Sequence, residues 1–205
     1  MAGLELVMAS ANPDKAAEIA AILGTVPGLR LHPRPADVPD VDETGETLVE
    51  NARLKAVALM EATGMAAVSD DTGLEIAALG GEPGVYSARY SGEHASYAEN
   101  VAKVLAELDR AGAVSPARRK ATFRTVAFVA FPDGAELWAE GTVTGVIAPR
   151  PVGDAGFGYD PVFAPDGCDN RTFAQMSGPE KHEISHRGRA FRALAELLGA
   201  DRGSS

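Results

Sequence analysis

The chain has 205 residues, enough for one well-buried core, and no composition shift or spacer divides it, so we expect a single domain over residues 1–205. Its 29 acidic and 19 basic residues give a formal net charge of −10, a field that repels nucleic acid and anionic membranes, and we expect neither as a partner. The single cysteine, Cys168, excludes an intramolecular disulfide, and "MAGLELVMAS" lacks the basic segment of a signal peptide, so a cytoplasmic protein is expected.

The first third of the chain alternates short apolar runs with amphipathic segments, which is typical of an α/β fold. Strands are predicted over 4–9, 29–32 and 66–69, and helices over 15–24 and 47–63. Gly24 is the expected end of the first helix. Prolines in "PRPADVPDVDETG" preclude a long helix between the second strand and the second helix.

The rest of the chain predicts a helix, an antiparallel hairpin and a terminal helix, which complete a mixed α/β sheet. The helix in "SYAENVAKVLAELDRAG" begins with a capping box formed by Ser96 and Glu99. A long hairpin is predicted for "TFRTVAFVAF", the turn "PDG" and "AELWAEGTVTGVIA". The segment "ISHRGRAFRALAELLG" predicts the last helix, with Ser185 as its N-cap, Gly199 past its end and a frayed tail over about 200–205.

The turn "SANPDK", residues 10–15, joins the first strand to the first helix and places Ser10, Asn12 and Lys15 near a helix N-terminus. Such a turn is a natural place for a phosphate oxygen, although it also fits ordinary helix capping. Lys55 shares a helical stripe with apolar residues. Its ammonium group therefore either turns inward, where it needs an anion such as phosphate, or reaches out to solvent.

Two adjacent acids, Asp70 and Asp71, follow the predicted strand at 66–69 and precede a glycine-dense segment, "GLEIAALGGEPG". Glycine allows the backbone to approach a ligand closely. Because neighbouring side chains on an extended segment point to opposite faces, we expect one of the two acids to face a site. Further carboxylate oxygens for Mg²⁺ are present upstream, at Asp42, Glu43 and Glu46.

The segment "GFGYDPVF" places two aromatic residues, Phe157 and Tyr159, among glycines beside Asp160. Aromatic rings in such a turn either stack on a base or belong to the core. Farther along, "EKHEISHRGRA" gathers basic side chains in an otherwise acidic chain: Lys181, His182, His186, Arg187 and Arg189. This cluster is either functional or a solvated helix start. The expected cap at Ser185 separates its histidines, so a zinc pair is not expected.

The motifs "SANPDK", "SDDTGLEIAALGGEPGVYSARYSG", "GFGYDPVF" and "SHRGRA", in this order, resemble the inosine triphosphate pyrophosphatase family of non-canonical purine nucleoside triphosphate pyrophosphatases. The resemblance spans nearly the whole chain. It implies hydrolysis of ITP, dITP and XTP to the monophosphate and pyrophosphate, Mg²⁺ dependence and a homodimer. It also implies an α/β fold: an elongated mixed β-sheet flanked by helices, in two lobes with the active site in the cleft between them.

The resemblance assigns roles to the residues that match the family pattern. Asp71 matches the catalytic proton acceptor, which also reaches the metal, and Glu43 matches a metal-binding acid, with Asp42 a rival close in register. The positions that match substrate-binding residues are Ser10, Ala11, Asn12, Pro13, Asp14, Lys15, Lys55, Thr72, Phe157, Gly158, Tyr159, Asp160, Lys181, His186 and Arg187. Ser10 stands where many members have threonine and Thr72 stands for serine, so both positions keep the hydroxyl.

These residues fit the implied chemistry, because magnesium and lysines neutralise a triphosphate while Asp71 deprotonates a water that attacks the α-phosphorus. Two other interpretations stay open. A hydrolase of canonical or modified pyrimidine triphosphates would use the same phosphate-binding residues and differ in the base pocket. A nucleotide sensor without turnover is expected to have lost Asp71 or Glu43, and both acids are present.

Overall fold

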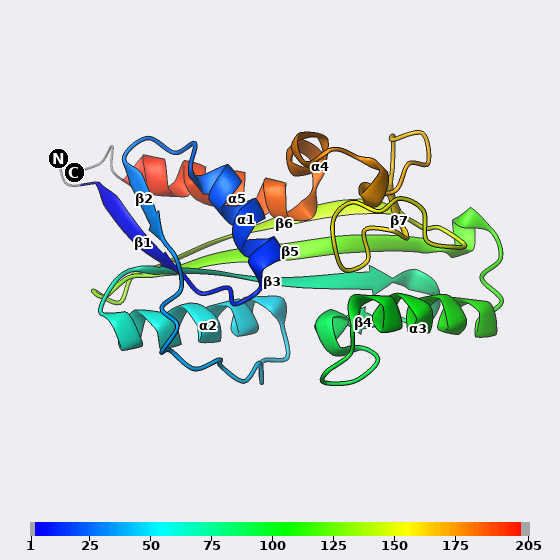
Figure 1. Ribbon diagram of the computed structural model, residues 1–205, viewed down its shortest axis with the longest axis horizontal. Helices are drawn as coiled ribbons and strands as arrows, with labels where there is room; N and C mark the ends of the chain where they lie inside the picture. Colours follow the sequence, from blue (N-terminus) through cyan, green and yellow to red (C-terminus); the bar gives the residue numbers. More distant parts are fainter. Residues whose placement is uncertain (1–2, 202–205) are drawn as a thin grey trace. The chain divides into compact units, whose positions relative to one another are not determined.

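The computed structural model describes residues 3–201, in which strands and helices alternate along the chain (Figure 1). The strands are β1 (Leu4–Met8), β2 (Leu29–His32), β3 (Ala67–Ile76), β4 (Pro83–Gly84), β5 (Lys120–Ala130), β6 (Glu136–Ile147) and β7 (Phe163–Pro165). The α-helices are α1 (Pro13–Leu23), α2 (Leu48–Thr63), α3 (Tyr97–Arg110), α4 (Gly178–Ile184) and α5 (His186–Asp201).

All seven strands belong to one mixed sheet in the order β2-β1-β3-β5-β6-β7, with β4 paired to β3. β1 pairs in parallel with both β2 and β3, whereas the pairs β3/β4 and β6/β7 are antiparallel. Helix α1 makes the crossover that parallel strands β1 and β2 require. The predicted α/β class with a mixed sheet and helices is therefore confirmed.

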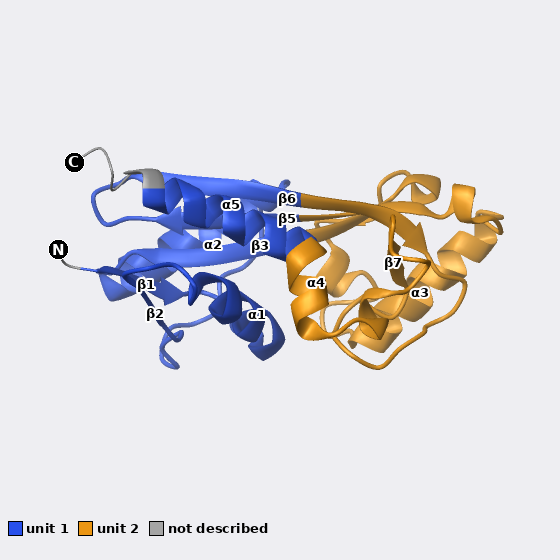
Figure 2. Cartoon of the chain, turned by 90° about the horizontal axis from the view of Figure 1, so that it is seen from above, with its two compact units in different colours: residues 1–71, 125–141, 186–205 blue, residues 72–124, 142–185 orange. Residues whose placement is uncertain are grey.

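The chain divides into two compact units (Figure 2). The first comprises residues 1–71, 125–141 and 186–205, and the second comprises residues 72–124 and 142–185. In the first unit, alternate residues of β1 pack on opposite faces of the sheet. Leu6 packs in one cluster with Ile19 of α1 and Phe191 of α5, whereas Val7 packs with Leu59 of α2. Figure 1 accordingly shows α2 on the other side of the sheet from α1 and α5.

The second unit has its own aromatic core. Phe123 of β5 packs edge-on against Phe163 of β7, with ring centroids 4.7 Å apart, and Phe173 lies 5.3 Å from Phe163. Val104 and Leu108 of α3 are fully buried in the same cluster. The predicted capping box at the start of α3 is confirmed, and this helix presents its apolar stripe to the core.

Several predicted boundaries differ from the structure. β3 does not end before the acids at 70 and 71 but continues through them to Ile76. A separate helix, α4, precedes Ser185, which is the C-cap of α4 and the residue just before α5. α5 continues to Asp201, so Gly199 lies inside the helix and not past its end. The predicted frayed tail begins within this helix, and its residues 202–205 lie outside the described part of the chain. No helix in residues 3–201 has both the length and the apolar character needed to cross a bilayer.

Candidate active site

Asp71 lies in the middle of β3, where it is 5% exposed, and it meets a lysine from α2. The Lys55 ammonium group donates to Asp71 Oδ1 at 2.9 Å and to Glu43 Oε1 at 2.7 Å. The side chain of Lys55 is only 16% exposed, so the structure supports the inward-turned alternative over the one in which the ammonium group reaches solvent. Asp42 is exposed, and the geometry therefore favours Glu43 as the upstream acid that joins Asp71.

Burial and charge both act on this cluster. Burial raises the pKa of Asp71, and the nearby Glu43 carboxylate adds to the effect; the attraction of Lys55 and Lys15 only partly opposes it, so the pKa lies above its usual value. Burial lowers the pKa of Lys55, but the attraction of Asp71, Glu43 and Asp70 outweighs burial, and the pKa is raised. Asp71 thus has the elevated pKa that suits a group accepting a proton in catalysis.

The second carboxylate oxygen of Asp71, Oδ2, is buried and finds no hydrogen-bond partner within the described residues 3–201. A buried polar atom left unpaired costs about 1–3 kcal/mol. Such a cost is commonly explained by a catalytic role or by a ligand, water or ion that supplies the partner. This oxygen is therefore the point of the cluster best suited to contact a metal or a reacting water.

The neighbouring acid, Asp70, belongs to a different ion-pair network. Its Oδ2 lies 3.2 Å from Arg187 Nη2 and 3.6 Å from Lys15 Nζ, and Arg187 Nη1 donates to Glu18 Oε2 at 2.5 Å. Burial raises the pKa of Asp70, but the cations Lys15 and Arg187 outweigh burial and hold it well below its usual range. The partners of Asp70 come from α1 and α5 and those of Asp71 from α2, so the two acids face opposite sides of the sheet, as predicted.

The turn at residues 10–15 caps helix α1. The Asn12 side-chain oxygen accepts from the backbone N–H groups of Asp14 and Lys15 at 2.9 and 3.2 Å, and the backbone N–H of Asn12 donates to Ser10 Oγ at 3.3 Å. Two amide groups that were candidates for a phosphate oxygen are therefore already satisfied. The capping interpretation is confirmed for Asn12, and the phosphate-binding role of the turn stays a prediction that rests on Ser10 and the Lys15 ammonium group.

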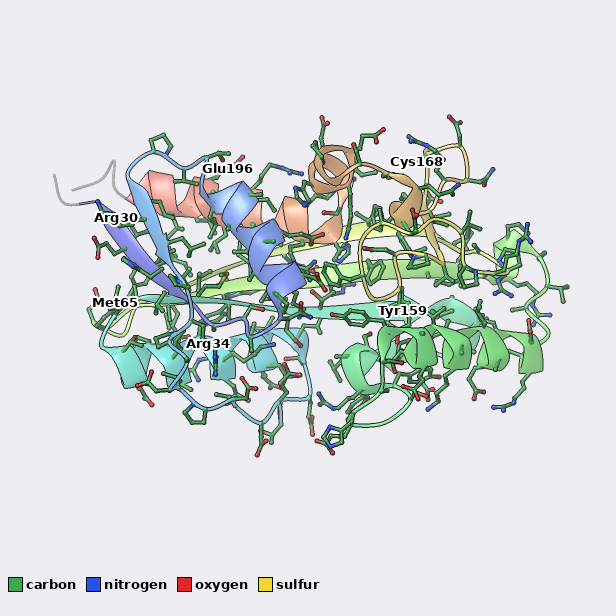
Figure 3. All side chains as sticks on the ribbon, in the orientation of Figure 1. Arg30, Arg34, Met65, Tyr159, Cys168 and Glu196 are labelled. Atoms are coloured by element: carbon green, nitrogen blue, oxygen red, sulfur yellow. The ribbon has the colours of Figure 1, made fainter. Side chains whose placement is uncertain are left out.

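Arg34, labelled in Figure 3, holds the start of the proline-rich segment that leads to the upstream acid. Its guanidinium group donates to the carbonyl oxygens of Ala9, Val38 and Pro39 at 2.7, 3.0 and 2.8 Å. A cavity of about 580 Å³ adjoins it and is lined partly by Ser10. Backbone carbonyls from the end of β1 and from the segment are thus joined by one side chain.

Three predicted base-pocket residues come together in the second unit. Asp160 Oδ2 accepts from Lys181 Nζ at 2.6 Å and from the backbone N–H of Phe157 at 2.8 Å. Lys181 Nζ lies 4.7 Å from the centroid of the Phe157 ring, within range of a cation–π interaction. Phe157 also lines an apolar cavity of about 520 Å³ together with Tyr97 and Val101 of α3. The lysine is thus fixed by a carboxylate beside a half-buried aromatic ring.

The other aromatic residue of this segment, Tyr159, labelled in Figure 3, belongs to the core of the second unit. Its hydroxyl donates to the carbonyl oxygen of Ser87 at 2.9 Å, and its ring lies 6.4 Å from that of Phe123. The core interpretation therefore describes Tyr159, whereas Phe157 keeps part of its surface exposed. Three more predicted residues are a half-buried Thr72 in β3, Gly158 with a φ of +62°, and a buried His186 at the start of α5. The last three predicted residues, Ala11, Pro13 and Asp14 of the turn before and at the start of α1, are exposed.

The sequence profile of the Ham1 family matches residues 6–197, which is nearly the whole chain. The chain belongs to the Ham1 family. A relative from Streptomyces avermitilis, named dITP/XTP pyrophosphatase, is 46% identical over 204 residues, which cover 95% of this chain and 98% of the relative. A relative of the same name from Nitratidesulfovibrio vulgaris is 47% identical over 205 residues, covering 95% of this chain and 96% of the relative.

Solved structures of Ham1 relatives share the fold. A HAM1 protein from Coxiella burnetii superposes with a TM-score of 0.86 at 41% identity, covering 96% of this chain and 99% of that chain. A protein from Mycobacterium abscessus described as nucleoside-triphosphatase / dITP/XTP pyrophosphatase superposes with a TM-score of 0.73 at 42% identity, covering 95% and 99% of the two chains. The family resemblance carried by the sequence motifs is therefore confirmed.

Two side chains that contact predicted site residues were not themselves predicted: Glu18, which pairs with Arg187, and Tyr97, which lies beside Phe157. Glu18 is three residues after Lys15 on α1, and residues at this spacing lie on the same side of a helix, so the spacing contains a usable signal. Tyr97, whose ring lies 5.9 Å from Phe157, opens α3 directly after its cap. Nothing in the local sequence connects Tyr97 with a segment sixty positions away.

Gly156 lies just before the residues predicted for the base pocket, Phe157 to Asp160, and a substitution there tests how closely this segment is packed. Its φ is +72°, and a Cβ atom there would overlap the Asp160 carboxylate, whereas Gly158 has a similar φ of +62° and open space around it. Gly156→Ala is expected to lower the free energy of unfolding by about 1–3 kcal/mol more than Gly158→Ala, since both share the backbone strain and only the first displaces the carboxylate. Urea unfolding of the two variants measures the difference, and equal losses would contradict a close contact at Gly156.

Proposed function

We propose that this Ham1 chain hydrolyses ITP, dITP and XTP to the nucleoside monophosphate and pyrophosphate, and so keeps deaminated purines out of DNA and RNA. The observation that carries this proposal is Asp71, a buried carboxylate with a raised pKa, one oxygen on the Lys55 ammonium group and the other buried without a hydrogen-bond partner in residues 3–201. The names of the relatives from Streptomyces avermitilis and Nitratidesulfovibrio vulgaris support the substrate class.

The donor set fits Mg²⁺. Carboxylate oxygens of Glu43 and Asp71 are the hard ligands that Mg²⁺ prefers, and Asp71 Oδ2 lacks a protein partner among the described residues. No cluster of three or more histidine, cysteine or acidic side chains that could hold an ion occurs in residues 3–201. A metal that takes one or two carboxylates and completes its shell with water and substrate phosphates matches such a set. When bound, Mg²⁺ neutralises charge on the triphosphate.

The protein groups then have distinct roles in the proposed reaction. Asp71 orients a water molecule and accepts its proton as the water oxygen attacks the α-phosphorus. The bond from the α-phosphorus to the bridging oxygen breaks, and pyrophosphate leaves with that oxygen. The ammonium groups of Lys15 and Lys55 offset phosphate charge, and the hydroxyl groups of Ser10 and Thr72 donate to phosphate oxygens. No covalent intermediate with the protein is required.

For the base we propose the group in the second unit. Phe157 offers a ring face for stacking, which adds affinity for any purine. Lys181 has donors only, so it favours the 6-oxo acceptor of inosine and xanthosine over the 6-amino donor of adenosine. Gly158, Tyr159 and Asp160 complete this proposed group, with Asp160 and Tyr159 shaping the segment around Phe157. The family resemblance also assigns His186 and Arg187 to base binding, and both belong to the first unit, where Arg187 pairs with Asp70 and Glu18. We further propose, from the family resemblance alone, a fold of two lobes with the active site in the cleft between them.

A substrate panel tests the proposal. Pyrophosphate release is measured for ITP, dITP, XTP, ATP, GTP and a set of modified pyrimidine triphosphates, each with Mg²⁺ and with excess chelator. We expect release from the 6-oxo purines ITP, dITP and XTP only when Mg²⁺ is present. Preference for a modified pyrimidine would favour the alternative hydrolase, and tight binding of ITP without turnover would favour a sensor.

We also propose that the chain works as a homodimer in the cytoplasm, where the nucleotide pool is found. The dimer rests on family resemblance. Light scattering at micromolar concentration is expected to report about twice the chain mass of 21.3 kDa. A constant monomer mass over that range would exclude it.

A further inference from the structure

The residues just before α2 form a short segment whose backbone is held at successive positions. Thr44 N–H donates to the carbonyl oxygen of Asp42 at 3.0 Å, which closes a tight turn with Glu43 at its centre. The next amide, that of Gly45, donates to Asn51 Oδ1 at 2.7 Å. The Glu43 carboxylate reaches Lys55 from this turn.

Asn51, which accepts this hydrogen bond from the Gly45 amide, lies on the buried side of α2. It is fully buried, with 0% exposure, and lies one helical turn before Lys55 on the same helix. Its Oδ1 is taken by the Gly45 amide, while its Nδ2 has no hydrogen-bond partner among the described residues. Only the oxygen end of this amide therefore contributes a bond, and a buried asparagine with one unused end is costly to keep for packing alone.

The Gly45 position is also closed to any larger residue. A Cβ atom there would lie 2.7 Å from Asn51 Oδ1 and 2.7 Å from the Cβ of Glu50. The capping box of α2 adds to this clamp, because the Glu50 carboxylate accepts from the N–H groups of Glu46 and Thr47 at 2.7 and 3.0 Å. The segment thus leaves the tight turn and runs directly onto the helix.

We propose that Asn51 is a positioning residue: through the Gly45 amide it sets the turn that carries Glu43, and so holds the Glu43 carboxylate against Lys55 and Asp71. The effect on metal binding rests on the proposed function, in which Glu43 and Asp71 hold the divalent ion. Asn51 itself contacts neither acid through a hydrogen bond that the structure shows. Its influence is therefore on the affinity of the pair for the ion and not on a chemical step.

The chain supplies a matched control in the second unit. Asn100 follows the capping box of α3 as Asn51 follows that of α2, and it is 2% exposed. Its Oδ1 accepts from Ser91 N–H at 2.8 Å and its Nδ2 donates to the carbonyl oxygen of Ala88 at 3.0 Å. Both asparagines thus hold an upstream loop on a capped helix, but only Asn51 holds the segment that carries Glu43.

The test compares Asn51→Leu, Asn51→Asp, Gly45→Ala and Asn100→Leu with the unmodified chain. Hydrogen exchange at the Gly45 amide reports the clamp, and Mn²⁺ binding followed by electron paramagnetic resonance reports the ion site. Asn51→Leu is expected to speed Gly45 exchange and to weaken Mn²⁺ binding, each by about tenfold, the scale of one lost hydrogen bond. Asn51→Asp keeps a side-chain oxygen that accepts from the Gly45 amide, so this amide should stay protected from hydrogen exchange.

Asn100→Leu is expected to lower the thermal unfolding temperature as Asn51→Leu does, with Gly45 exchange and Mn²⁺ affinity unchanged. Gly45→Ala leaves Asn51 intact and should also weaken Mn²⁺ binding about tenfold, which keeps the test decisive should the leucine variant fail to fold. If Asn51→Leu or Gly45→Ala binds Mn²⁺ as tightly as the unmodified chain, the positioning role of Asn51 is overturned, whereas the proposed ion site stands. An unmodified chain that binds no Mn²⁺ overturns the proposed ion site as well.

Discussion

Asp71→Asn is expected to lower kcat for dITP by at least about 10²-fold, the scale of a lost general base. Asparagine keeps the shape of the side chain and an oxygen for Lys55, but it does not accept a proton from the attacking water. In the proposed reaction this carboxylate accepts the proton, a role that the raised pKa of Asp71 and its Oδ2, without a hydrogen-bond partner in the described residues, support. Initial rates of pyrophosphate release at saturating dITP and Mg²⁺ measure the effect.

The stability of the same variant provides a second readout. A carboxyl group whose folded-state pKa is raised contributes stability below its ordinary pKa, and that contribution is lost as pH rises through the folded-state value. At neutral pH the raised pKa of Asp71 means that its own ionisation adds no stability, whereas its attraction raises the pKa of Lys55 and helps to stabilise that buried ammonium group. Asp71→Asn should therefore lower the free energy of unfolding less than the equivalent change at Asp70. Asp70→Asn is the matched control, because the lowered pKa of Asp70 means that its charge stabilises the fold above its ordinary pKa.

Asp70→Asn should accordingly lose stability at neutral pH, and the loss should shrink as pH falls through the acidic range. The two variants separate the roles of adjacent acids that share a strand and a degree of burial. Near-normal dITP turnover by Asp71→Asn would move the proton acceptor to Asp70 or to another group. A stable Asp70→Asn at neutral pH would contradict the ion pairs with Arg187 and Lys15.

The elements whose ends have strong local signals were predictable. The capping residue Thr47 fixes the start of α2, Ser96 that of α3, and Gly24 ends α1. These signals act within a single helical turn, so no knowledge of distant contacts is needed. The start of α4 has the same kind of box, Ser177 with Glu180, but no helix is predicted before Ser185, because the segment "EKHEISHRGRA" indicates only a basic cluster there.

The continuation of β3 through its acids could not be predicted locally. Charged side chains are rarely buried, and two adjacent acids usually indicate a loop. In this chain Asp70 and Asp71 stay inside the sheet because cations from α1, α2 and α5 neutralise them on both faces. Those cations are distant in sequence, at positions from Lys15 to Arg187, so only the folded chain reveals the compensation.

Much the same holds for the candidate site. Asp71, Lys55 and Glu43 were each predicted, but their mutual contacts and the choice of Glu43 over Asp42 required the structure. Arg187 was predicted for the base pocket from its motif alone. The structure shows it in the first unit, 2% exposed, on the carboxylates of Asp70 and Glu18. Its ion pairs depend on residues more than one hundred positions away, which no local pattern specifies.

Arg187→Met is expected to lower the free energy of unfolding by about 3–5 kcal/mol at neutral pH, because it leaves two buried carboxylates without their shared cation. Methionine fills much of the volume, so lost charge and not a cavity is the main cause. The pKa of Asp70 is held low partly by Arg187, and the stability that this supplies is lost as pH falls through the folded-state pKa. The deficit of the variant should therefore be smaller at strongly acidic pH, and urea unfolding across the acidic range measures it.

Lys181→Met is the natural comparison, since Lys181 is also buried and has the carboxylate of Asp160 as its partner in the other unit. The proposed function makes Lys181 a donor to the 6-oxo group, and the family resemblance assigns Arg187 to base binding as well. On that hypothesis each variant should lower the ratio of kcat/KM for ITP to kcat/KM for ATP, measured well below the unfolding temperature of the variant. A wrong donor against a 6-amino group costs about 1–3 kcal/mol, so a fall of about tenfold or more is expected. An Arg187→Met variant that loses stability but keeps the full ratio would restrict Arg187 to holding Asp70 and Glu18, and would assign base selection to Lys181 and the backbone around it.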